Sequence, residues 1–494
     1  MTTISKAAGV SGLGRRGALA LFGAATLARP SLAQAPQKRH ILVLGAGMSG
    51  LTAALSLLRA GHDVSVIEYQ NRVGGRLLSV PIGAGQWSEA GGGHFRANMP
   101  YVLHYLRQFS LPLYGLNDGL PRYVVQGQRI NSASLADWPL PLHPSERNMT
   151  VASNLWRYLV LAGFDSDTVL DHRWPADEAV LERLGNVTLG AILKEVGASD
   201  AFLALLDAHA GLETHTAQAL GILPDLAYHF GDQNLFRVQQ GNQRLPQALA
   251  QAIGMERIHL ASPVRAIDQS GGRIRVTVEG GRDFTGDAVI STIPFSVMDG
   301  VQVTPGWSAP KQRMFREMEW EKTVKVILQT RSPQWLKQNI RGWPVLGGDR
   351  PWERIIDITG NEPSGRGNVF FYLNGANAQA YLDRPAATRA QDFLADFRRE
   401  EPDFVDEPTF LDHFSWGEQP WIRGSFAGIP IGGGWMVREW EKPEGRIHFA
   451  GDWTSLKSGW VEGAIESGLR AARQIDPAAR PEGNPRIRQE GGLP

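Results

Sequence analysis

Three glycines and one acidic residue have the types and the spacing of a nucleotide-binding site. Gly45, Gly47 and Gly50 follow directly after the apolar residues 41–44, and Glu68 ends a second apolar run. In such a pattern the first glycine permits a tight turn, the second lets the backbone approach a diphosphate, and the third lets a helix pack closely on its strand. An acid about 20 residues later can accept both hydroxyls of a ribose. The pattern therefore predicts a site for a dinucleotide without a 2′-phosphate.

Two strands and a helix must position these residues. Residues 41–44 are apolar at every position, as in a strand that is buried on both faces of a parallel sheet. Leu51 and Leu55 recur at helical spacing before Gly61, so a helix here points its N-terminus and its partial positive charge at the phosphates. Residues 64–67 are expected to form the second strand.

The composition excludes several classes of function. Of the 494 residues, 50 are basic and 50 are acidic, so no excess of charge points to nucleic acid or to an anionic membrane surface. The chain has no cysteine, which rules out disulfides and thiolate metal sites, and its 12 histidines form no metal-binding motif. The length and the 43% hydrophobic content predict about two or three globular domains with large cores.

Residues 1–35 resemble a twin-arginine export signal. Arg15 and Arg16 precede the apolar residues 18–28, which are too few to span a bilayer, and the segment ends in a small-x-small cleavage pattern. The mature protein is therefore expected in the periplasm or outside the cell, although a disordered basic tail is the alternative. No later segment has the apolar length that a membrane helix needs, and residues 479–494 are expected to be a flexible tail.

Three further motifs follow in order along the chain. They are R-x-G-G-R at residues 72–76, the strand and glycine turn QWSEAGGG at residues 86–93, and a strand, turn and helix start at residues 446–468. Together with the glycine pattern, these motifs resemble those of the flavin-containing amine oxidase family, which includes monoamine oxidases, polyamine oxidases and L-amino acid oxidases. The resemblance covers most of residues 40–475.

The resemblance implies an α/β fold with two domains. A discontinuous Rossmann-like domain, built from a parallel sheet with helices, is expected to bind FAD, and an α+β domain is expected to bind the substrate. The FAD-binding domain is expected to comprise residues 36–100, 235–300 and 421–478. The substrate-binding domain is expected to comprise residues 101–234 and 301–420.

FAD is expected to bind without a covalent bond, because the chain offers no cysteine for a tether. The resemblance places the diphosphate at the glycines and Arg76, the adenine against the backbone of Val264 and the ribityl chain at Asp452. The helix that starts after Trp460 is expected to stabilise negative charge on the flavin ring. The full set of expected FAD-binding residues is Gly45, Gly47, Met48, Ser49, Gly50, Glu68, Tyr69, Gly75, Arg76, Gly91, Gly92, Gly93, Val264, Gly451, Asp452, Trp460 and Val461.

Three residues form the expected catalytic group. Lys325 lies in the strand pattern TVKVIL, which continues to Trp335, and matches the family lysine that holds a water at the reactive flavin nitrogen. A cation there can also stabilise charge that develops when oxygen is reduced. Phe426 and Trp460 match the two aromatic positions that flank the substrate nitrogen and exclude water. Each residue has an ordinary alternative: a solvated lysine in a strand, or an aromatic side chain in the core.

The reaction implied by the resemblance is oxidative deamination. A hydride equivalent leaves a C–N bond, the imine hydrolyses, and dioxygen or another acceptor takes the electrons, with hydrogen peroxide as the product from dioxygen. Amino-acid oxidases of the family commonly carry a carboxylate-binding arginine where this chain has His94. The loss of that charged fork favours amines without a carboxylate as substrates. An L-amino acid oxidase is the alternative if Arg96, two residues further on, replaces it.

Two other functions share part of this pattern. The nucleotide unit and the GGR signature also occur in carotenoid desaturases and protoporphyrinogen-oxidising enzymes, which act on C–C bonds of large apolar substrates. A flavin-binding protein without catalytic activity is the second alternative. Lys325, Phe426 and Trp460 favour the amine branch. The expected partners are a small amine or amino acid and an electron acceptor, and the possibility of a homodimer is left open.

Overall fold

The computed structural model describes residues 38–481 apart from residues 84, 117–119, 126–127, 131–134, 137, 172, 176, 212, 232–233, 339, 347–349, 360–364 and 402–407. The expected export signal and most of the expected C-terminal tail lie outside the described residues. Among the residues that are described, no helix has the length and apolar character needed to cross a membrane.

A parallel sheet carries the glycine motif. Its strands run in the order β11-β2-β1-β15-β24, and every neighbouring pair is parallel. Separate parts of the chain supply these strands, which are β1 (His40–Leu44), β2 (Asp63–Ile67), β11 (Ile258–His259), β15 (Ala288–Ser291) and β24 (Ile447–Phe449). The strands predicted at residues 41–44 and 64–67 are confirmed. Because the carboxyl ends of parallel strands meet at one edge, the glycine turn and Glu68 lie side by side there.

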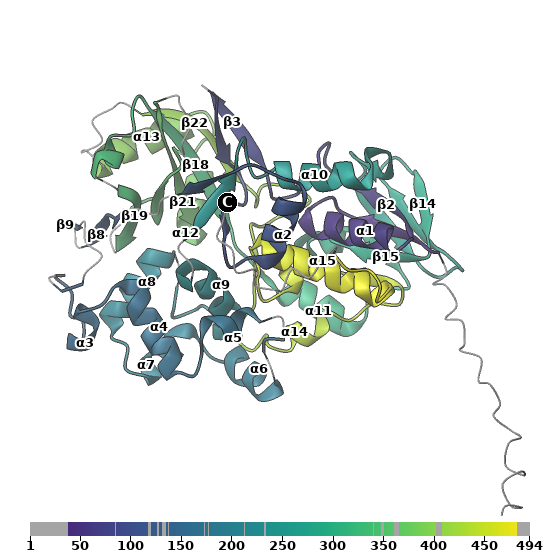
Figure 1. The fold of residues 1–494 in the computed structure, drawn as a ribbon, viewed down its shortest axis with the longest axis horizontal. Helices are drawn as coiled ribbons and strands as arrows, with labels where there is room; N and C mark the ends of the chain where they lie inside the picture. The colour runs from purple at the N-terminus through teal and green to yellow at the C-terminus, as the bar shows by residue number, and fades with distance from the viewer. Residues whose placement is uncertain are drawn as a thin grey trace, which may run out of the picture. The chain divides into compact units, whose positions relative to one another are not determined.

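The apolar residues of β1 divide between two cores, because successive side chains of a strand point to opposite faces. Ile41 and Val43 belong to a core shared with helices, and Leu42 and Leu44 belong to a core shared with a smaller sheet. Figure 1 shows the helices beside one another: α1 (Met48–Arg59), α10 (Arg244–Ile253) and α15 (Val461–Ile475). The smaller sheet has the order β14-β13-β12-β16 and contains β12 (Val264–Asp268), β13 (Ile274–Val278), β14 (Asp283–Gly286) and β16 (Gln302–Thr304).

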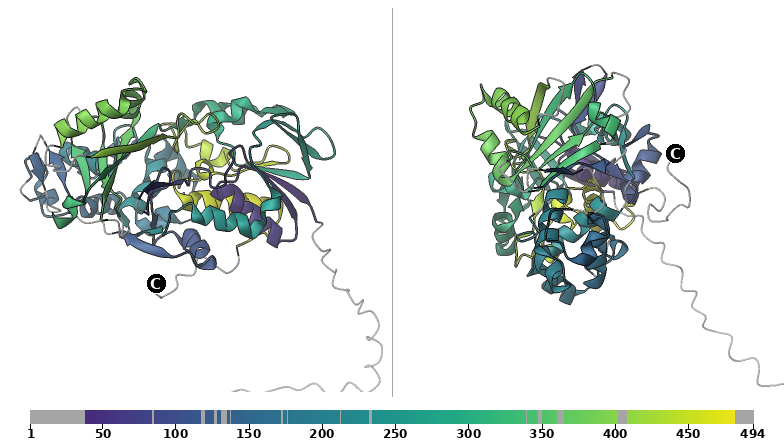
Figure 2. Two further views of the ribbon diagram at one scale, coloured as in Figure 1. Left: turned by 90° about the horizontal axis from the view of Figure 1, so that it is seen from above. Right: turned by 90° about the vertical axis from the view of Figure 1, so that its left-hand side faces the viewer.

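A larger, mostly antiparallel sheet carries Lys325. Its order is β22-β18-β21-β20-β19-β8-β9, and its strands are β22 (Thr409–Ser415), β18 (Thr323–Thr330), β21 (Gly367–Asn374), β20 (Arg354–Asp357), β19 (Ile340–Leu346), β8 (Tyr123–Val125) and β9 (Gln128–Ile130), with β7 (Leu120–Pro121) beside β19. On one face, Val324 and Val326 pack in a core with Phe393. The helices α12 (Gly375–Leu382) and α13 (Arg389–Glu400) cover that face, as the green helices of Figure 2 show. Thr323 and Lys325 therefore point to the opposite face.

The strand of Lys325 is shorter than the sequence predicts. β18 ends at Thr330, and Trp335 lies in a 3-10 helix, Gln334–Gln338. Pro333 accounts for the difference, because a proline has no backbone N–H to donate to a neighbouring strand.

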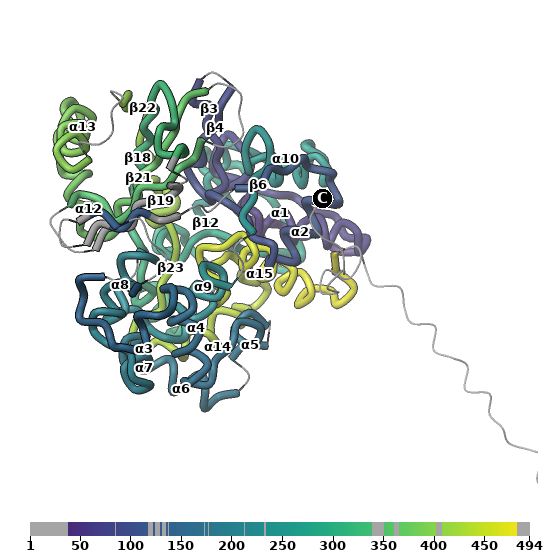
Figure 3. Tube along the Cα trace, turned by 60° about the vertical axis from the view of Figure 1, so that its left-hand side comes forward, coloured from purple at the N-terminus to yellow at the C-terminus, as the bar shows by residue number. Residues whose placement is uncertain are grey.

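Helices form a separate group next to α15. They are α3 (Pro144–Arg147), α4 (Val151–Leu161), α5 (Ser166–Leu170), α6 (Glu178–Gly185), α7 (Leu189–Glu195), α8 (Asp200–Ala210) and α9 (Ala219–Gly231), and Figure 3 shows them gathered below the antiparallel sheet. The remaining segments include α2 (Pro100–Gln108), α11 (Ala309–Glu317), α14 (Met436–Glu439), the antiparallel strands β5 (Phe95–Arg96), β10 (Leu235–Val238) and β6 (Leu113–Leu116), and the pairs β3 (Ser79–Gly83) with β4 (Gln86–Glu89) and β17 (Glu319–Trp320) with β23 (Ala427–Gly428).

Candidate active site

A cavity of about 1520 Å³ lies at the carboxyl ends of β1, β2 and β15. It exceeds the volume of about 300–1,000 Å³ that small-molecule sites usually have. All the expected FAD-binding, catalytic and substrate-binding residues line it except Gly50 and Arg96. Gly50 packs α1 against the turn instead, since a Cβ atom there would lie 2.0 Å from the carbonyl oxygen of Gly45.

Glycines leave space for a ligand at the N-terminus of α1. Gly45 has a φ of +108°, and a Cβ atom on it would lie 2.2 Å from Oγ1 of Thr292. A Cβ atom on Gly75 would lie 3.2 Å from Cα of Gly47, so the two glycine motifs meet backbone to backbone. Gly47 is the N-cap of α1 and provides no side-chain acceptor for the first-turn N–H groups. These groups are therefore suited to bind an anion from the cavity.

Glu68 is buried at the end of β2, with 2% of its surface exposed. One carboxylate oxygen accepts the backbone N–H of Ala46 at 2.6 Å, and the other accepts that of Gln70 at 2.9 Å. Burial raises the pKa of Glu68, while these hydrogen bonds act in the opposite direction. Each carboxylate oxygen has two lone pairs, so each retains one for a further donor such as a ribose hydroxyl.

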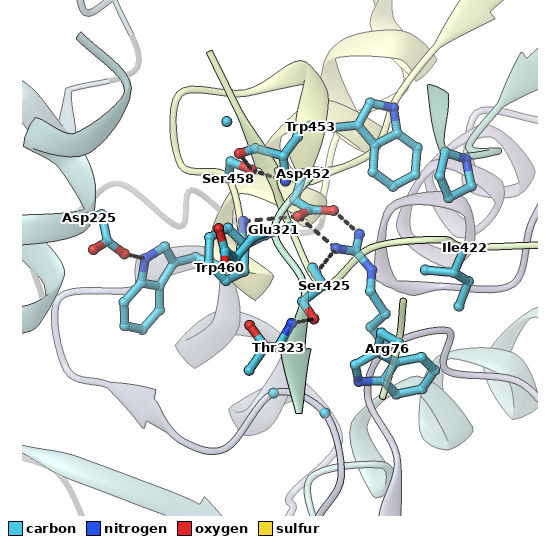
Figure 4. A pocket seen from close by; sticks show the side chains of 18 of the residues that line it. Arg76, Asp225, Glu321, Thr323, Ile422, Ser425, Asp452, Trp453, Ser458 and Trp460 are labelled. Carbon is cyan, nitrogen blue, oxygen red and sulfur yellow. Dashed lines mark hydrogen bonds and ion pairs between the residues drawn. The ribbon is translucent and has the colours of Figure 1, made fainter. Parts of the chain in front are cut away.

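Arg76 and Asp452 join the second glycine motif to the C-terminal motif. The two side chains form an ion pair, and Arg76 donates from Nη1 to the carbonyl oxygen of Ser425 at 2.5 Å (Figure 4). Asp452 also accepts the backbone N–H of Gly459 at 2.9 Å. These contacts connect residues 376 positions apart and fix one wall of the cavity.

The carbonyl groups of residues 91–93 each accept a hydrogen bond from a different side chain. Lys325 donates to the first at 2.5 Å, Asn242 to the second at 3.0 Å, and Arg237 to the third at 2.5 Å. Lys325 also donates to the carbonyl oxygen of Glu89 at 3.3 Å. Lys325 also forms a hydrogen bond with the hydroxyl of Tyr372, so its three N–H donors all have partners within the protein.

Lys325 belongs to a row of side chains that crosses the antiparallel sheet. Strand register places Phe414 opposite Lys325, Lys325 opposite Tyr372, and Tyr372 opposite Arg354. All four side chains line the cavity. Nζ of Lys325 and Cζ of Arg354 each lie 5.1 Å from the centre of the Tyr372 ring. Burial raises the pKa of the Tyr372 hydroxyl, but the charges of Lys325 and Arg354 outweigh it and lower this pKa overall.

Trp460 forms an aromatic part of the wall at the N-cap of α15. Its indole Nε1 donates to Oδ1 of Asp225 at 2.7 Å, as Figure 4 shows, and its ring lies 4.9 Å from that of Tyr228. Phe426 lies nearby, because a Cβ atom on Gly459 would be 3.3 Å from Cβ of Phe426. The two expected aromatic residues therefore share one region of the cavity.

The Asp225 carboxylate beside Trp460 titrates far above its ordinary range. Burial raises its pKa to about 6, against the hydrogen bond from Trp460 and the charges of Arg354 and Arg96, which lower it. His229 Nε2 is 3.6 Å from Oδ2 of Asp225, and burial together with nearby cations lowers the pKa of His229 well below its usual value. The cavity therefore contains a carboxylate that changes charge near pH 6.

His94 lines the cavity as a neutral ring, and Arg96 acts on the cavity through its charge without lining it. Burial, assisted by nearby cations, holds the pKa of His94 well below its usual range, so the ring is neutral at neutral pH. Arg96 is buried within β5 and is not among the cavity-lining residues. Its charge nevertheless acts on His94, Asp225 and His229, which line the cavity. Arg96 as a direct carboxylate ligand therefore stays a prediction.

Three cavity residues were missed by the sequence analysis: Asp225, Arg354 and Tyr372. Asp225 is one of many acidic residues in the helical group, and its position depends on how α9 packs against Trp460. Arg354 and Tyr372 become neighbours only through the register of β20 and β21. The one available signal is a charged or aromatic residue within a short apolar strand, and that pattern is also common in ordinary half-exposed strands.

Comparison with known proteins gives consistent results. Residues 48–476 match the family described as flavin containing amine oxidoreductase. The flavin-dependent L-tryptophan oxidase RebO of Lentzea aerocolonigenes is 28% identical over 473 residues, covering 89% of this chain and 98% of that protein. Amine oxidase A of Equus caballus is 24% identical over 464 residues, covering 88% of this chain and 84% of that protein. A triple mutant of putrescine oxidase has the same fold, with a TM-score of 0.75, 22% identity, and coverage of 89% and 98%.

Proposed function

Because the chain belongs to the flavin-containing amine oxidoreductase family and is an FAD-dependent oxidoreductase of CH–NH₂ donors, we propose that its cavity oxidises a small amine or amino acid with dioxygen as electron acceptor. The products are then the imine, which hydrolyses, and hydrogen peroxide. The observation that carries this proposal is the convergence of the FAD motifs, Lys325, Phe426 and Trp460 on one cavity.

The cavity has the features that FAD requires. The glycine turn and the uncapped N-terminus of α1 suit the diphosphate, the free lone pairs of Glu68 suit the adenosine ribose, and the uncapped N-terminus of α15 suits the flavin ring. The buried hydroxyl of Tyr69 has no hydrogen-bond partner among the described residues and lines the same cavity. When bound, FAD would supply the acceptor for the hydride equivalent that leaves the carbon bearing the amine, while the amine nitrogen loses a proton to give the imine.

The aromatic residues orient the substrate and keep water out. Trp460 and Phe426 both line the cavity, and an amine is attracted to aromatic ring faces by their quadrupoles. Asp225 holds the indole of Trp460 in place through the hydrogen bond to Nε1, which reduces the loss of side-chain freedom on binding. Above about pH 6 the Asp225 carboxylate also offers a negative charge to a substrate ammonium beside Trp460.

Lys325 supplies a fixed positive charge. Its hydrogen bonds to the carbonyl groups of Glu89 and Gly91 hold the ammonium group in one position. A fixed cation stabilises negative charge that develops near it, with no cost of reorganisation when oxygen is reduced.

The charged lining separates this function from the desaturase alternative. Asp225, Glu353, Arg354 and Lys325 all line the cavity. A site for a large apolar substrate needs an apolar wall, because burying charged groups against hydrocarbon is costly. The lining therefore favours a small polar substrate.

The experiment is an anaerobic screen of the FAD-loaded protein with amines and amino acids. We expect at least one compound to bleach the flavin absorbance, and air to restore it with one hydrogen peroxide formed per turnover. A flavin band that no amine or amino acid bleaches would refute the proposal and indicate a flavin-binding protein without this activity. If air restores the flavin absorbance but no hydrogen peroxide forms, the proposed reduction of dioxygen to hydrogen peroxide is wrong.

A separate proposal concerns export, which rests on the sequence of residues 1–35 alone. Folded export suits a protein that must acquire its cofactor before crossing the membrane. Replacing Arg15 and Arg16 together by lysine is expected to leave the protein in the cytoplasm with its signal uncleaved. Unchanged export of the double variant would contradict a twin-arginine signal.

A further inference from the structure

We infer that Arg354 binds the carboxylate of the substrate, and that the enzyme acts on α-amino acids rather than on simple amines. The inference rests on the oxidation proposed above and names its substrate class. It assigns the carboxylate site to β20 of the antiparallel sheet, away from residues 94–96, where the sequence placed it.

The first observation is that no described carboxylate is bound directly to Arg354. Arg76, Lys325 and Arg354 are the arginine and lysine side chains that line the cavity within the described part of the chain. Arg76 is paired with Asp452, and Lys325 donates to two backbone carbonyl groups. Arg354 forms no ion pair with any described carboxylate and donates only from Nη1, to the carbonyl oxygen of His209 at 3.3 Å. Asp225 and Glu353 act on Arg354 electrostatically, but neither forms an ion pair or a hydrogen bond with it, so the guanidinium is held away from water without a directly bound anion.

The second observation is the edge of the guanidinium that stays free. Nε of Arg354 is enclosed and has no acceptor, and no described residue accepts from Nη2. Nε and Nη2 form one edge of the planar group, and a carboxylate binds such an edge with two parallel hydrogen bonds. Gly211 leaves the space beside this edge, because a Cβ atom on it would lie 3.5 Å from Nε. Gly211 lines the same cavity.

The third observation is the position of Arg354 relative to the reacting groups. Lys325 and Arg354 lie on either side of Tyr372, each 5.1 Å from its ring centre, so the two cations are at most twice that distance apart. In an α-amino acid the carboxylate carbon is bonded directly to the carbon that carries the amine. A carboxylate on Arg354 therefore brings the C–N bond close to Arg354, whose charge acts on Tyr372 and on Asp225, the partner of Trp460.

The charges around Arg354 match a zwitterion better than a diamine. Asp225 and Glu353 line the cavity and interact electrostatically with Arg354. Arg354 can bind the carboxylate of an amino acid while the neighbouring carboxylates bind its ammonium group. A diamine such as putrescine would instead place its second ammonium group against the positive charge of Arg354. We therefore expect diamines to be poor substrates.

A structural role for Arg354 makes a different prediction. His209 is in the last turn of α8, so the hydrogen bond to its carbonyl group also caps that helix. A residue that only caps α8 contributes to thermal stability and has the same effect on substrates with and without a carboxylate.

The test compares Arg354→Met and Arg354→Lys with the parent, all loaded with FAD. Arg384→Met is the matched control, because it removes a partly buried arginine that pairs with Asp396 and does not line the cavity. The substrates are L-phenylalanine with 2-phenylethylamine and L-leucine with 3-methylbutylamine, pairs that differ only in the carboxylate. Benzoate, followed through its effect on the flavin absorption spectrum, measures carboxylate binding without turnover.

We expect the Kd for the amino acids and for benzoate to rise about 100-fold in Arg354→Met and about tenfold in Arg354→Lys, which keeps the charge and loses the fork. The Kd for the amines should change less than about threefold, and Arg384→Met should change neither class. A parent that amines bleach and amino acids do not would overturn the inference, and so would an Arg354→Met variant that weakens both classes equally. If no compound bleaches the flavin, the proposed oxidation fails instead. The benzoate titration still decides the role of Arg354 in that case, since an equal Kd in parent and Arg354→Met overturns it.

Discussion

Asp225→Asn tests whether the carboxylate beside Trp460 is charged at neutral pH. It also measures by how much that charge lowers the free energy of unfolding. Asparagine has nearly the same shape, and its Oδ1 can still accept the indole N–H that Asp225 accepts at 2.7 Å. The substitution therefore removes the charge and preserves the contact. Its effect on stability should depend on pH in a way that the pKa of Asp225 determines.

The sign follows from the direction of the shift. Burial raises the folded-state pKa of Asp225 from 3.8 to about 6, so the folded state binds the proton more tightly than the unfolded state. Below pH 3.8 the carboxyl group is protonated in both the folded and the unfolded state, so it does not lower the free energy of unfolding. As the pH rises from 3.8 through about 6 the folded protein loses stability, and the full cost of about 3 kcal/mol is present above pH 6. Asparagine carries no such cost.

The loss of stability caused by the Asp225 charge depends on the pH range. About half of the 3 kcal/mol develops between pH 5 and pH 8, where the folded carboxylate loses its proton and the unfolded one is already ionised. A neutral acceptor weakens the bond to the indole by roughly 1 kcal/mol at high pH. Asp225→Asn should therefore be more stable than the parent by roughly 2 kcal/mol at pH 8, and its advantage should shrink toward pH 5.

The assay is thermal unfolding of parent and variant from pH 5 to pH 8, compared as a difference at each pH. An increase of the apparent Tm difference by on the order of 1–2 °C across this range is expected. Asp165→Asn is the control, because Asp165 is the N-cap of α5 and its pKa is lowered, so its effect should stay constant above pH 5. Curves for parent and Asp225→Asn that remain parallel from pH 5 to pH 8 would refute the raised pKa. The pH profile of the flavin reduction rate should show a pKa near 6 in the parent, and this pKa should be absent in the variant.

Four further predictions follow from the site. Acid precipitation of the FAD-loaded protein should leave a yellow supernatant, because the chain has no cysteine that could hold the flavin through a thioether; a coloured pellet would contradict this. Lys325→Met should retain FAD and, in a stopped-flow experiment, should slow reoxidation of the flavin by air more than its anaerobic reduction by substrate. If variant and parent are reoxidised by oxygen at the same rate, Lys325 has a structural role only. Trp460→Ala should slow flavin reduction because the substrate is held less firmly, whereas lower thermal stability with an unchanged rate would place Trp460 in the core. Glu68→Gln should weaken FAD retention during gel filtration by on the order of tenfold, because one amide group cannot accept hydrogen bonds on both of its ends; unchanged retention would remove Glu68 from the ribose site.

The nucleotide unit was predictable because its determinants are local in the sequence. The apolar run at residues 41–44, the glycines and Glu68 each act through their own strand, turn or helix, and the period of the pattern fixes which residues face the ligand. The strand and helix at the C-terminal motif follow the same logic. The local pattern of apolar residues also predicted the strand of Lys325. That strand ends at Thr330, before Pro333, and is shorter than the pattern indicates.

The substrate side was less predictable because it depends on contacts between distant segments. Arg354 reaches Tyr372 through the pairing of β20 with β21, and a shift of one residue in that register would turn its side chain to the opposite face of the sheet. Asp225 reaches Trp460 across 235 residues. Arg96 illustrates the converse, because it follows His94 closely in sequence and acts on Asp225 through its charge, yet does not line the cavity itself. Sequence spacing determines position only within one element, and the substrate region is assembled from several.

The cavity wall owes its rigidity to bonds that connect these distant segments. Arg76 with Asp452, Lys325 with Gly91, and Asp225 with Trp460 each join residues more than 200 positions apart. Because the bonds form when the chain folds, the cost in conformational entropy of ordering these side chains is met before FAD or substrate binds. The same bonds couple the two sides of the cavity, since Lys325 belongs to the antiparallel sheet and the glycines that it holds belong to the FAD side. A change that displaces β18 should therefore weaken FAD binding as well as catalysis, even when no residue that contacts the cofactor is replaced.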